Sequence, residues 1–340
     1  MVNLKDLTFE ELETFVVESG EPKYRAKQIY MWLYKGISSF DDMNNIPKSL
    51  KEKLCEKAFI SVAEIEEKYV SKIDGTKKYL LKLGDGSYIE SVLMEYNHGY
   101  TICVSSQVGC LMGCKFCAST LNGKTRNLTP GEISDQLLAV SRDAGVRISN
   151  IVMMGIGEPF DNFENVLKFL KNATDENAFG IGMRHITIST CGLADKIREL
   201  ADKKLQLTLS VSLHASNDKI RSEIMPVNKK YPISDLISAC DYYIKKTNRR
   251  VSFEYTLISG VNDNKKEASE LAALLKGKLC HVNLIPVNAV SETGFRRSAK
   301  ENVEKFRQYL EAQGITATVR REMGSDINAA CGQLRNKKLN

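Results

Sequence analysis

The sequence predicts an α/β protein: a parallel sheet preceded by a small helical domain. Three observations predict this class. From residue 100 onward, short β-branched runs alternate with segments that have the apolar spacing of amphipathic helices. Residues 1–60 have helical patterns. Between these two parts, a polar-apolar alternation around the turn signal GDG is typical of a β-hairpin.

The first element is the helical domain, which we expect over residues 1–60. The segment TFEELETFVVES begins with Thr8 and Glu11 at the spacing of a capping box. A second segment, PKYRAKQIYMWLYKG, begins with proline and ends with glycine, as helices often do. Residues 61–99 are then expected to form a hairpin linker, and residues 100–340 the main domain.

The main domain contains seven candidate strands: YTICVSS, SNIVMMG, HITIST, LTLSVSL, VSFEYTL, HVNLIPV and TATVRR. Six amphipathic segments separate them, beginning with GEISDQLLAVSRDAG and ending with KENVEKFRQYLEAQG. Six strand-helix units and a last strand predict either an open doubly wound sheet or a partial (β/α)6 barrel. In both architectures, active-site residues gather beyond the carboxyl ends of the strands.

Composition narrows the class of protein. The chain has 340 residues, of which 43% are hydrophobic and 26% charged, as expected of a globular protein. Its first residues are charged and no run is long enough to span a bilayer, which predicts a cytoplasmic protein without a membrane anchor. Nine cysteines without a secretion signal favour metal or redox chemistry over a disulfide framework. The net charge of +6 is compatible with a nucleic-acid partner without requiring one.

Three of the cysteines stand close together. Cys110, Cys114 and Cys117 form the pattern C-x3-C-x2-C in a loop after the first strand of the main domain. Thiolates at this spacing can wrap a zinc ion or an iron-sulfur cluster. A structural zinc site normally needs four ligands, and no nearby Cys or His pair offers a fourth. A cubane cluster with three cysteine ligands leaves one iron open, so the pattern favours a cluster, with zinc as the alternative.

This pattern resembles the signature of radical S-adenosylmethionine (radical SAM) enzymes. The resemblance implies a TIM-like partial barrel and one [4Fe-4S] cluster, whose open iron binds the amino and carboxylate groups of SAM. The segment GIGEP resembles the second-strand motif of these enzymes, which implies that Gly157 and Glu158 lie at the SAM amino group. Further SAM contacts implied by the resemblance are Ser189, Ser212, Leu213, His214 and Asn288.

Further motifs resemble one family within this superfamily. CVSSQVGC, RNLTPGEI, SLHASND, RSEIMPVNKKYP, FEYTLISGVND and INAACGQL are similar to the RlmN/Cfr family of RNA adenine methyltransferases, from about residue 3 to 335. Members methylate either C2 or C8 of an adenine and share the same cysteines. The span NLIPVNAVSETGFRRS looks more like the C2 enzymes, although VNAV departs from their usual asparagine-proline sequence.

The resemblance implies three catalytic residues. Cys331 takes a methyl group from one SAM molecule, and a second SAM supplies a radical that activates this methyl group. Cys103 resolves the protein-RNA adduct and leaves a transient disulfide with Cys331, while Glu90 is the implied proton acceptor. The implied targets are adenine 2503 in 23S rRNA and adenine 37 in tRNAs. A C8 methyltransferase of 23S rRNA is the alternative, and a non-catalytic zinc or iron-sulfur RNA-binding module is the alternative of another class.

The expected partners follow from this chemistry. They are 23S rRNA, tRNA and a flavodoxin-like or ferredoxin-like electron donor, with the chain acting as a monomer. The target base must leave its stack to reach a buried site. RNA backbone contacts are expected from basic segments, namely KYRAK, KTR, NKK, the arginine pairs at 296–297 and 320–321, and the tail RNKK.

Overall fold

The computed structural model describes residues 1–288 and 294–334, and its main body is built on a ten-stranded sheet. The strand order is β14-β13-β12-β11-β10-β9-β6-β5-β4-β3. All seven strands expected after residue 100 are present, and each runs parallel to its neighbour. They are β6 (Gly99–Cys103), β9 (Ile148–Met153), β10 (Ile186–Thr190), β11 (Thr208–Ser212), β12 (Val251–Leu257), β13 (Cys280–Pro286) and β14 (Ala317–Val319).

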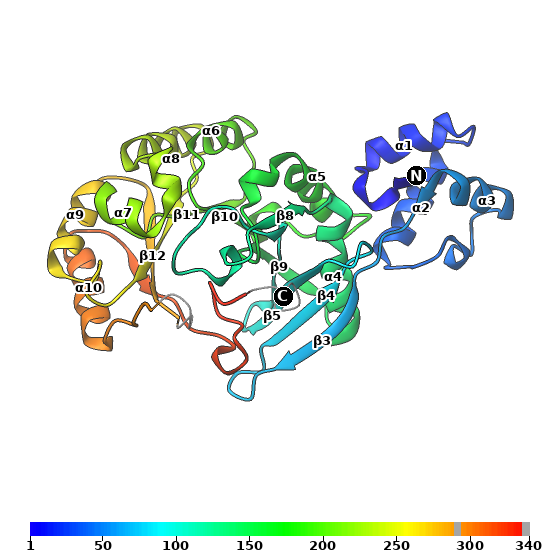
Figure 1. Cartoon of the computed structure of the whole chain (residues 1–340). Helices are drawn as coiled ribbons and strands as arrows, with labels where there is room; N and C mark the ends of the chain where they lie inside the picture. The colour runs from blue at the N-terminus through cyan, green and yellow to red at the C-terminus, as the bar shows by residue number, and fades with distance from the viewer. Residues whose placement is uncertain (289–293, 335–340) are drawn as a thin grey trace.

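Helices connect these strands and cover one side of the curved sheet (Figure 1). The six expected helices are α4 (Pro130–Ala144), α5 (Phe163–Thr174), α6 (Ala194–Asp202), α8 (Ile233–Thr247), α9 (Lys265–Leu275) and α10 (Lys300–Ala312). Helix α4 shows why they form where they do. Thr129 and Glu132 make a capping box at its start, and Gly145 ends it in the left-handed conformation. The predicted α/β class with a mostly parallel sheet is therefore confirmed.

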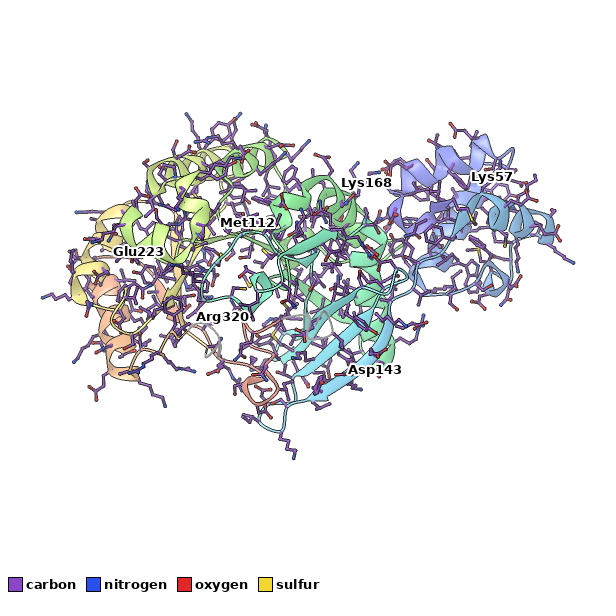
Figure 2. All side chains as sticks on the ribbon, in the orientation of Figure 1. Lys57, Met112, Asp143, Lys168, Glu223 and Arg320 are labelled. Carbon is purple, nitrogen blue, oxygen red and sulfur yellow. The ribbon has the colours of Figure 1, made fainter. Side chains whose placement is uncertain are left out.

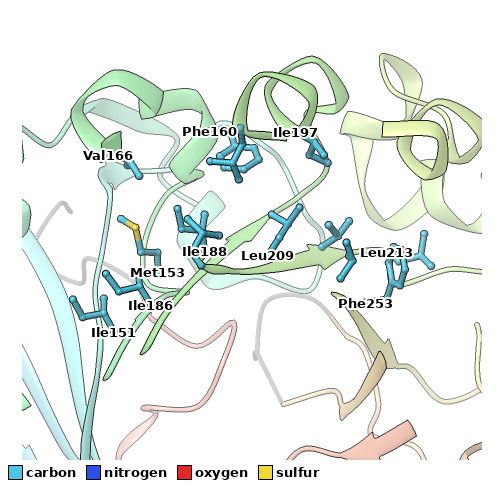
Figure 3. Close-up of a cluster of buried hydrophobic side chains, with 14 of the residues drawn as sticks. Ile151, Met153, Phe160, Val166, Ile186, Ile188, Ile197, Leu209, Leu213 and Phe253 are labelled. Atoms are coloured by element: carbon cyan, nitrogen blue, oxygen red, sulfur yellow. The ribbon is translucent and has the colours of Figure 1, made fainter. Parts of the chain in front are cut away.

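The core lies between the sheet and these helices. Alternate strand residues point toward the helices, and Figure 3 shows Ile186, Ile188 and Leu209 beneath Phe160 and Ile197. The intervening residues face the other side of the sheet, because successive side chains of a strand alternate. On β10, β11 and β12 these include Ser189, Ser210, Ser212, Glu254 and Thr256. The same alternation that builds the core thus lines the inner face with polar groups.

The N-terminal residues form a helical unit with its own apolar cluster. Its helices are α1 (Phe9–Glu18), α2 (Tyr24–Tyr34) and α3 (Lys48–Lys57), and the short strands β1 (Val2–Asn3) and β2 (Ala58–Phe59) pair beside them. The expected capping box of Thr8 and Glu11 is present. The buried Lys5 ammonium lies 2.5 Å from Asp135 on α4, which joins this unit to the main body.

An antiparallel extension follows. Strands β4 (Lys77–Lys82) and β5 (Tyr88–Tyr96) form the hairpin expected around GDG, and β3 (Glu64–Val70) adds a further strand. Because β5 pairs with β6, the hairpin is a continuous part of the main sheet. Several elements of the described chain were not predicted: the strands β1, β2 and β3, the helix α7 (Asp218–Ile224), and the small hairpin of β7 (Gln107–Gly109) and β8 (Lys124–Asn127). Within the described ranges, no helix is long and apolar enough to cross a membrane.

Candidate active site

The cysteine loop is held open by the β7–β8 hairpin. The backbone N–H of Cys110 donates to the Gly123 carbonyl oxygen at 2.8 Å, which closes the base of the loop. Gly109 has a φ of +77°, and a Cβ there would collide with the same carbonyl, so this position requires glycine. Farther along, the N–H of Lys115 donates to the Ile224 carbonyl at 2.9 Å, so α7 supports the loop.

The three thiols of this loop share one cavity. Cys110, Cys114 and Cys117 all line a hollow of about 900 Å³ at the carboxyl ends of β9, β10 and β11. Burial is the largest cause that raises the pKa of the Cys110 thiol to about 12, and a negative charge at Cys117 contributes to this rise. Burial also raises the pKa of Cys114 and Cys117. Ionising three adjoining buried thiols therefore requires a positive centre among them, as an iron-sulfur cluster supplies.

Opposite the thiols, the GEP turn is fixed by hydrogen bonds. Glu158 is buried, and its carboxylate accepts from the N–H groups of Phe160 at 3.0 Å and Cys191 at 2.7 Å. Burial raises the pKa of this carboxyl although these bonds oppose the shift. Gly157 has a φ of +106° and lies against Gln107, whose side-chain oxygen accepts from the Glu158 N–H. Both predicted residues line the same cavity as the thiols.

The remaining predicted SAM contacts divide into two groups. Ser189, Ser212, His214 and Asn288 line the cavity, whereas Leu213 is fully buried and does not. His214 has a φ of +54°, and its Nδ1 accepts from the Thr256 N–H at 2.9 Å. That bond requires a neutral ring, and burial lowers the pKa of His214 to about 3. The left-handed backbone at His214 turns its ring toward Phe116 of the cysteine loop, with ring centroids 4.8 Å apart.

A second cavity of about 620 Å³ adjoins the first. Cys331 lines both, together with Asn288 and Arg320, while Cys103 lines only the second. Three backbone contacts hold the Cys331 segment: Ala118 N–H to Gly332 O at 2.8 Å, Ser119 Oγ to Leu334 O at 2.7 Å, and Asn288 Nδ2 to Cys331 O at 3.0 Å.

Arg320 is the cation at this boundary (Figure 2). Its guanidinium lies 3.6 Å from the Glu254 carboxylate and donates to the Met154 sulfur at 3.2 Å. The pKa of Arg320 is raised, and a negative charge at Cys331 is the largest cause. Cys103 lies deeper, and burial raises the pKa of its thiol to about 12. The arrangement therefore places two thiols beside one guanidinium.

Comparisons with known proteins identify relatives of this chain. Residues 2–60 match the family model described as the ribosomal RNA large subunit methyltransferase N-terminal domain, and residues 104–272 match the radical SAM superfamily. A protein from Clostridium botulinum named "Probable dual-specificity RNA methyltransferase RlmN" is 57% identical over 98% of this chain and 96% of its own length. One of the same name from Thermoanaerobacter pseudethanolicus is 56% identical over 100% of this chain and 99% of its own. The chain belongs to the RlmN family.

A solved structure supports the same assignment. The crystal structure of a radical SAM methyltransferase from Sphaerobacter thermophilus is 47% identical and has a TM-score of 0.93, covering 98% of this chain and 99% of that one. The fold is therefore a radical SAM fold, and the cofactors of the superfamily are a [4Fe-4S] cluster and SAM. The donor set fits these cofactors, because three buried thiols and the GEP turn line one hollow. Across the described ranges, no group of three or more His, Cys, Asp or Glu side chains has the geometry to hold a single metal ion.

Glu90, the implied proton acceptor, lies beside the second cavity without lining it. It is buried on β5 and its carboxylate is 3.2 Å from the Lys78 ammonium. The next residues on the same face of the strand, Val92 and Met94, do line that cavity. Lys78 in turn donates to the Asn328 carbonyl, in the segment that leads to Cys331.

Two arginines at or beside the site were not predicted from the sequence. Arg320 was expected on the RNA-facing surface, but it lines both cavities. Arg221, in the unpredicted helix α7, is fully buried and donates to the Cys191 and Ser212 carbonyls at the ends of β10 and β11. Neither position differs from a surface arginine in local sequence. The departure VNAV and the basic tail RNKK fall partly or wholly outside the described residues.

Proposed function

We propose that this protein methylates C2 of an adenine in RNA, with adenine 2503 of 23S rRNA and adenine 37 of tRNAs as targets, and that Cys331 carries the methyl group. One observation carries the proposal: Cys331 lines both adjoining cavities. The first also contains the three cluster thiols, and the second contains Cys103. A thiol at their boundary can take a methyl group from SAM on one side and pass it to a base on the other.

The acceptor atom explains why a carrier is needed. The C2 hydrogen of adenine is not acidic enough to leave at neutral pH, so C2 cannot attack the sulfonium methyl group of SAM directly. Bound to Cys110, Cys114 and Cys117, the [4Fe-4S] cluster would supply the electron that cleaves SAM and generates a 5′-deoxyadenosyl radical. Gly157 and Glu158 would hold the amino group of SAM beside it.

The chain's own residues then act in sequence. The Cys331 thiolate attacks the SAM methyl group, so that an S–C bond forms and the sulfonium C–S bond breaks. After a hydrogen atom passes from this S-methyl group to the 5′-deoxyadenosyl radical, its carbon joins C2 of the base. Glu90 accepts the C2 proton, and the unpaired electron that remains passes to the flavodoxin-like or ferredoxin-like partner. The Cys103 thiolate attacks the Cys331 sulfur, so that an S–S bond forms and the S–C bond to the base breaks. The released carbon takes up a proton, which gives the methylated RNA and leaves a disulfide that an external thiol must reduce. The Arg320 guanidinium lies in the second cavity with both sulfur atoms.

The partners complete the proposal. The target adenine is extruded from its stack into the second cavity, because neither cavity admits a base-paired helix. The N-terminal helical unit, residues 1–60, supplies an accessory RNA contact. A flavodoxin-like or ferredoxin-like protein donates the electron, and the chain acts as a monomer.

The test is nucleoside analysis of RNA treated with reconstituted protein, SAM and a reductant under anaerobic conditions. Wild-type protein should produce 2-methyladenosine, identified against 2-methyl- and 8-methyladenosine standards. Cys331→Ala should keep its iron, sulfide and SAM binding yet produce no methylated adenine. Cys280→Ala, a thiol outside both cavities, is the matched control and should stay active. Full activity of Cys331→Ala would refute the carrier, and 8-methyladenosine would refute the C2 assignment.

A further inference from the structure

A third cavity lies where the N-terminal helical unit meets the main body. It has about 780 Å³ of empty space and is lined by the end of α2, by α4 with the loop that follows it, and by the loop before β10. Ile148, the first residue of β9, is in its wall, whereas Met153 at the other end of β9 lines the SAM cavity. The six residues of β9 span about 20 Å. This junction pocket is therefore at the opposite end of the strands from the catalytic site.

The junction pocket is strongly cationic. Lys35, Arg142 and Arg147 are among its eleven lining residues, and none of the eleven is acidic. All three are exposed, and none forms a salt bridge with another residue in the described ranges. In contrast, two other cations near this junction are paired: Lys68 with Asp143 at 2.6 Å and Lys168 with Glu11 at 2.6 Å. An unopposed group of three cations favours a polyanion.

Aromatic rings form part of the same pocket. Tyr34 from α2 and Phe179 from the main body meet edge to face, with ring centroids 5.1 Å apart. The Lys35 ammonium also lies 4.4 Å from the centroid of the Trp32 ring. Cations beside aromatic rings are the combination that holds the phosphates and bases of nucleic acid.

An exposed stripe on α2 leads into the pocket. Tyr24, Lys27, Met31 and Lys35 are spaced three or four residues apart and so share one face of the helix. All four are exposed, with Tyr24 57% and Met31 40% accessible. The opposite face of α2 is buried in the N-terminal apolar cluster. The α2 stripe thus presents two lysines, an aromatic ring and a thioether to a partner.

We propose that the junction pocket and the α2 stripe form a second RNA-binding surface, which holds the phosphate backbone of the substrate RNA far from the acceptor adenine. The proposal rests on the proposed function. The two ends of β9, one in the wall of the junction pocket and the other in the SAM cavity, are about 20 Å apart. This straight-line distance equals about six nucleotide steps of a helix, and a path around the protein surface is longer. Only an RNA that extends well beyond the target nucleotide can occupy both sites. The surface therefore selects large folded RNA over short fragments.

The test measures RNA binding by the full-length chain as a function of RNA length and salt. The probes are 23S rRNA fragments centred on the acceptor adenine, from the shortest that wild-type protein binds measurably to one of domain size. Wild-type affinity should increase with length. The triple variant Lys35→Ala, Arg142→Gln, Arg147→Gln should bind the longest RNA roughly 10- to 100-fold more weakly, and its salt slope should be shallower by about 2 to 3. Its affinity for the shortest RNA should not change.

A matched control removes three charges elsewhere. Lys265, Lys276 and Lys305 are exposed on or beside α9 and α10, at the other end of the molecule (Figure 1), and their replacement by alanine should leave the length dependence intact. Equal unfolding temperatures and iron contents would show that the variants fold alike. An unchanged salt slope for the triple variant, or an equal loss for short and long RNA, would overturn the proposal. Failure of wild-type protein to methylate any RNA would instead refute the proposed function, because the binding measurement does not require turnover.

Discussion

Replacing Arg221 with methionine should both destabilise the protein and weaken its cluster loop. The guanidinium is fully buried, and across the described residues no carboxylate lies within ion-pair distance of it. It donates to five oxygens, namely those of Cys191 (2.7 Å), Asn228 (2.8 Å), Leu213 (3.1 Å), Tyr231 (3.2 Å) and Ser212 (3.2 Å). These acceptors belong to the ends of β10 and β11 and to the turn after α7. Arg221 therefore fixes α7 to the sheet.

The size of the effect follows from these bonds. Leaving a buried acceptor unsatisfied costs at least about 1 kcal/mol, so five acceptors cost about 5 kcal/mol. Methionine avoids burying a charge, whose desolvation lowers the pKa of Arg221, and this offsets part of the loss. We expect a net decrease of about 3 to 5 kcal/mol in the free energy of unfolding. For a chain of this length, that lowers the melting temperature by roughly 4 to 7 °C.

Urea unfolding of the cluster-free protein measures the first effect, and iron content after reconstitution measures the second. Iron should decrease because the N–H of Lys115, between two cluster cysteines, donates to Ile224 on α7. Arg221→Lys keeps the charge but fewer of the five bonds, so it should recover less than half of the lost stability. A loss below about 1 kcal/mol in Arg221→Met, or wild-type stability in Arg221→Lys, would contradict the reasoning.

Three further predictions concern the groups that position the site. The pKa of His214 is about 3 in the folded protein and about 6.5 when unfolded, so the unfolded state takes up a proton as pH falls below 6.5. Between pH 7 and pH 5 this group alone should remove about 2 kcal/mol of stability, measured as the difference in pH dependence between wild-type protein and His214→Asn, a replacement that suits the positive φ. Gly109→Ala should disrupt the β7–β8 hairpin and lower the iron bound after reconstitution, whereas Gly123→Ala, where a Cβ meets no atom, should bind more iron than Gly109→Ala. Lys5→Met should cost about 3 kcal/mol at pH 8 because it leaves the Asp135 carboxylate buried without a cation. Burial raises the pKa of Asp135 to about 6 even beside Lys5, so the variant should recover stability as pH falls through that range, and a loss that does not depend on pH would contradict this cause.

Local patterns predicted the elements whose formation depends on neighbouring residues. The capping box at Thr8 and the hairpin at GDG each need only a few adjacent positions, and both are present. The β7–β8 hairpin escaped prediction because its strands have three and four residues, and the second, KTRN, is polar throughout. Helix α7 has only seven residues and follows a short loop, so its apolar period is too brief to recognise.

The residues of the candidate site likewise divide into those that the sequence could predict and those that it could not. The three cluster cysteines and the GEP turn could be assigned together because both follow parallel strands, whose carboxyl ends meet at one edge. Cys103 and Cys331 are far apart in the sequence, so only the family resemblance joined them. Arg320 and Arg221 could not be identified, since the partners that distinguish them from surface charges come from other strands and loops.

The backbone contacts around Cys331 explain how one thiol can serve two cavities. The hydrogen bonds that hold this segment use main-chain carbonyls of Cys331, Gly332 and Leu334, and none of them uses the Cys331 sulfur. Their donors are Asn288 after β13 and two residues of the cysteine loop, Ala118 and Ser119. The segment is therefore positioned by the same loop that holds the cluster ligands, while its side chain stays free to react. A loss of the cysteine loop's conformation should accordingly displace Cys331, the proposed methyl carrier, as well, which would couple cofactor binding to the geometry of the second cavity.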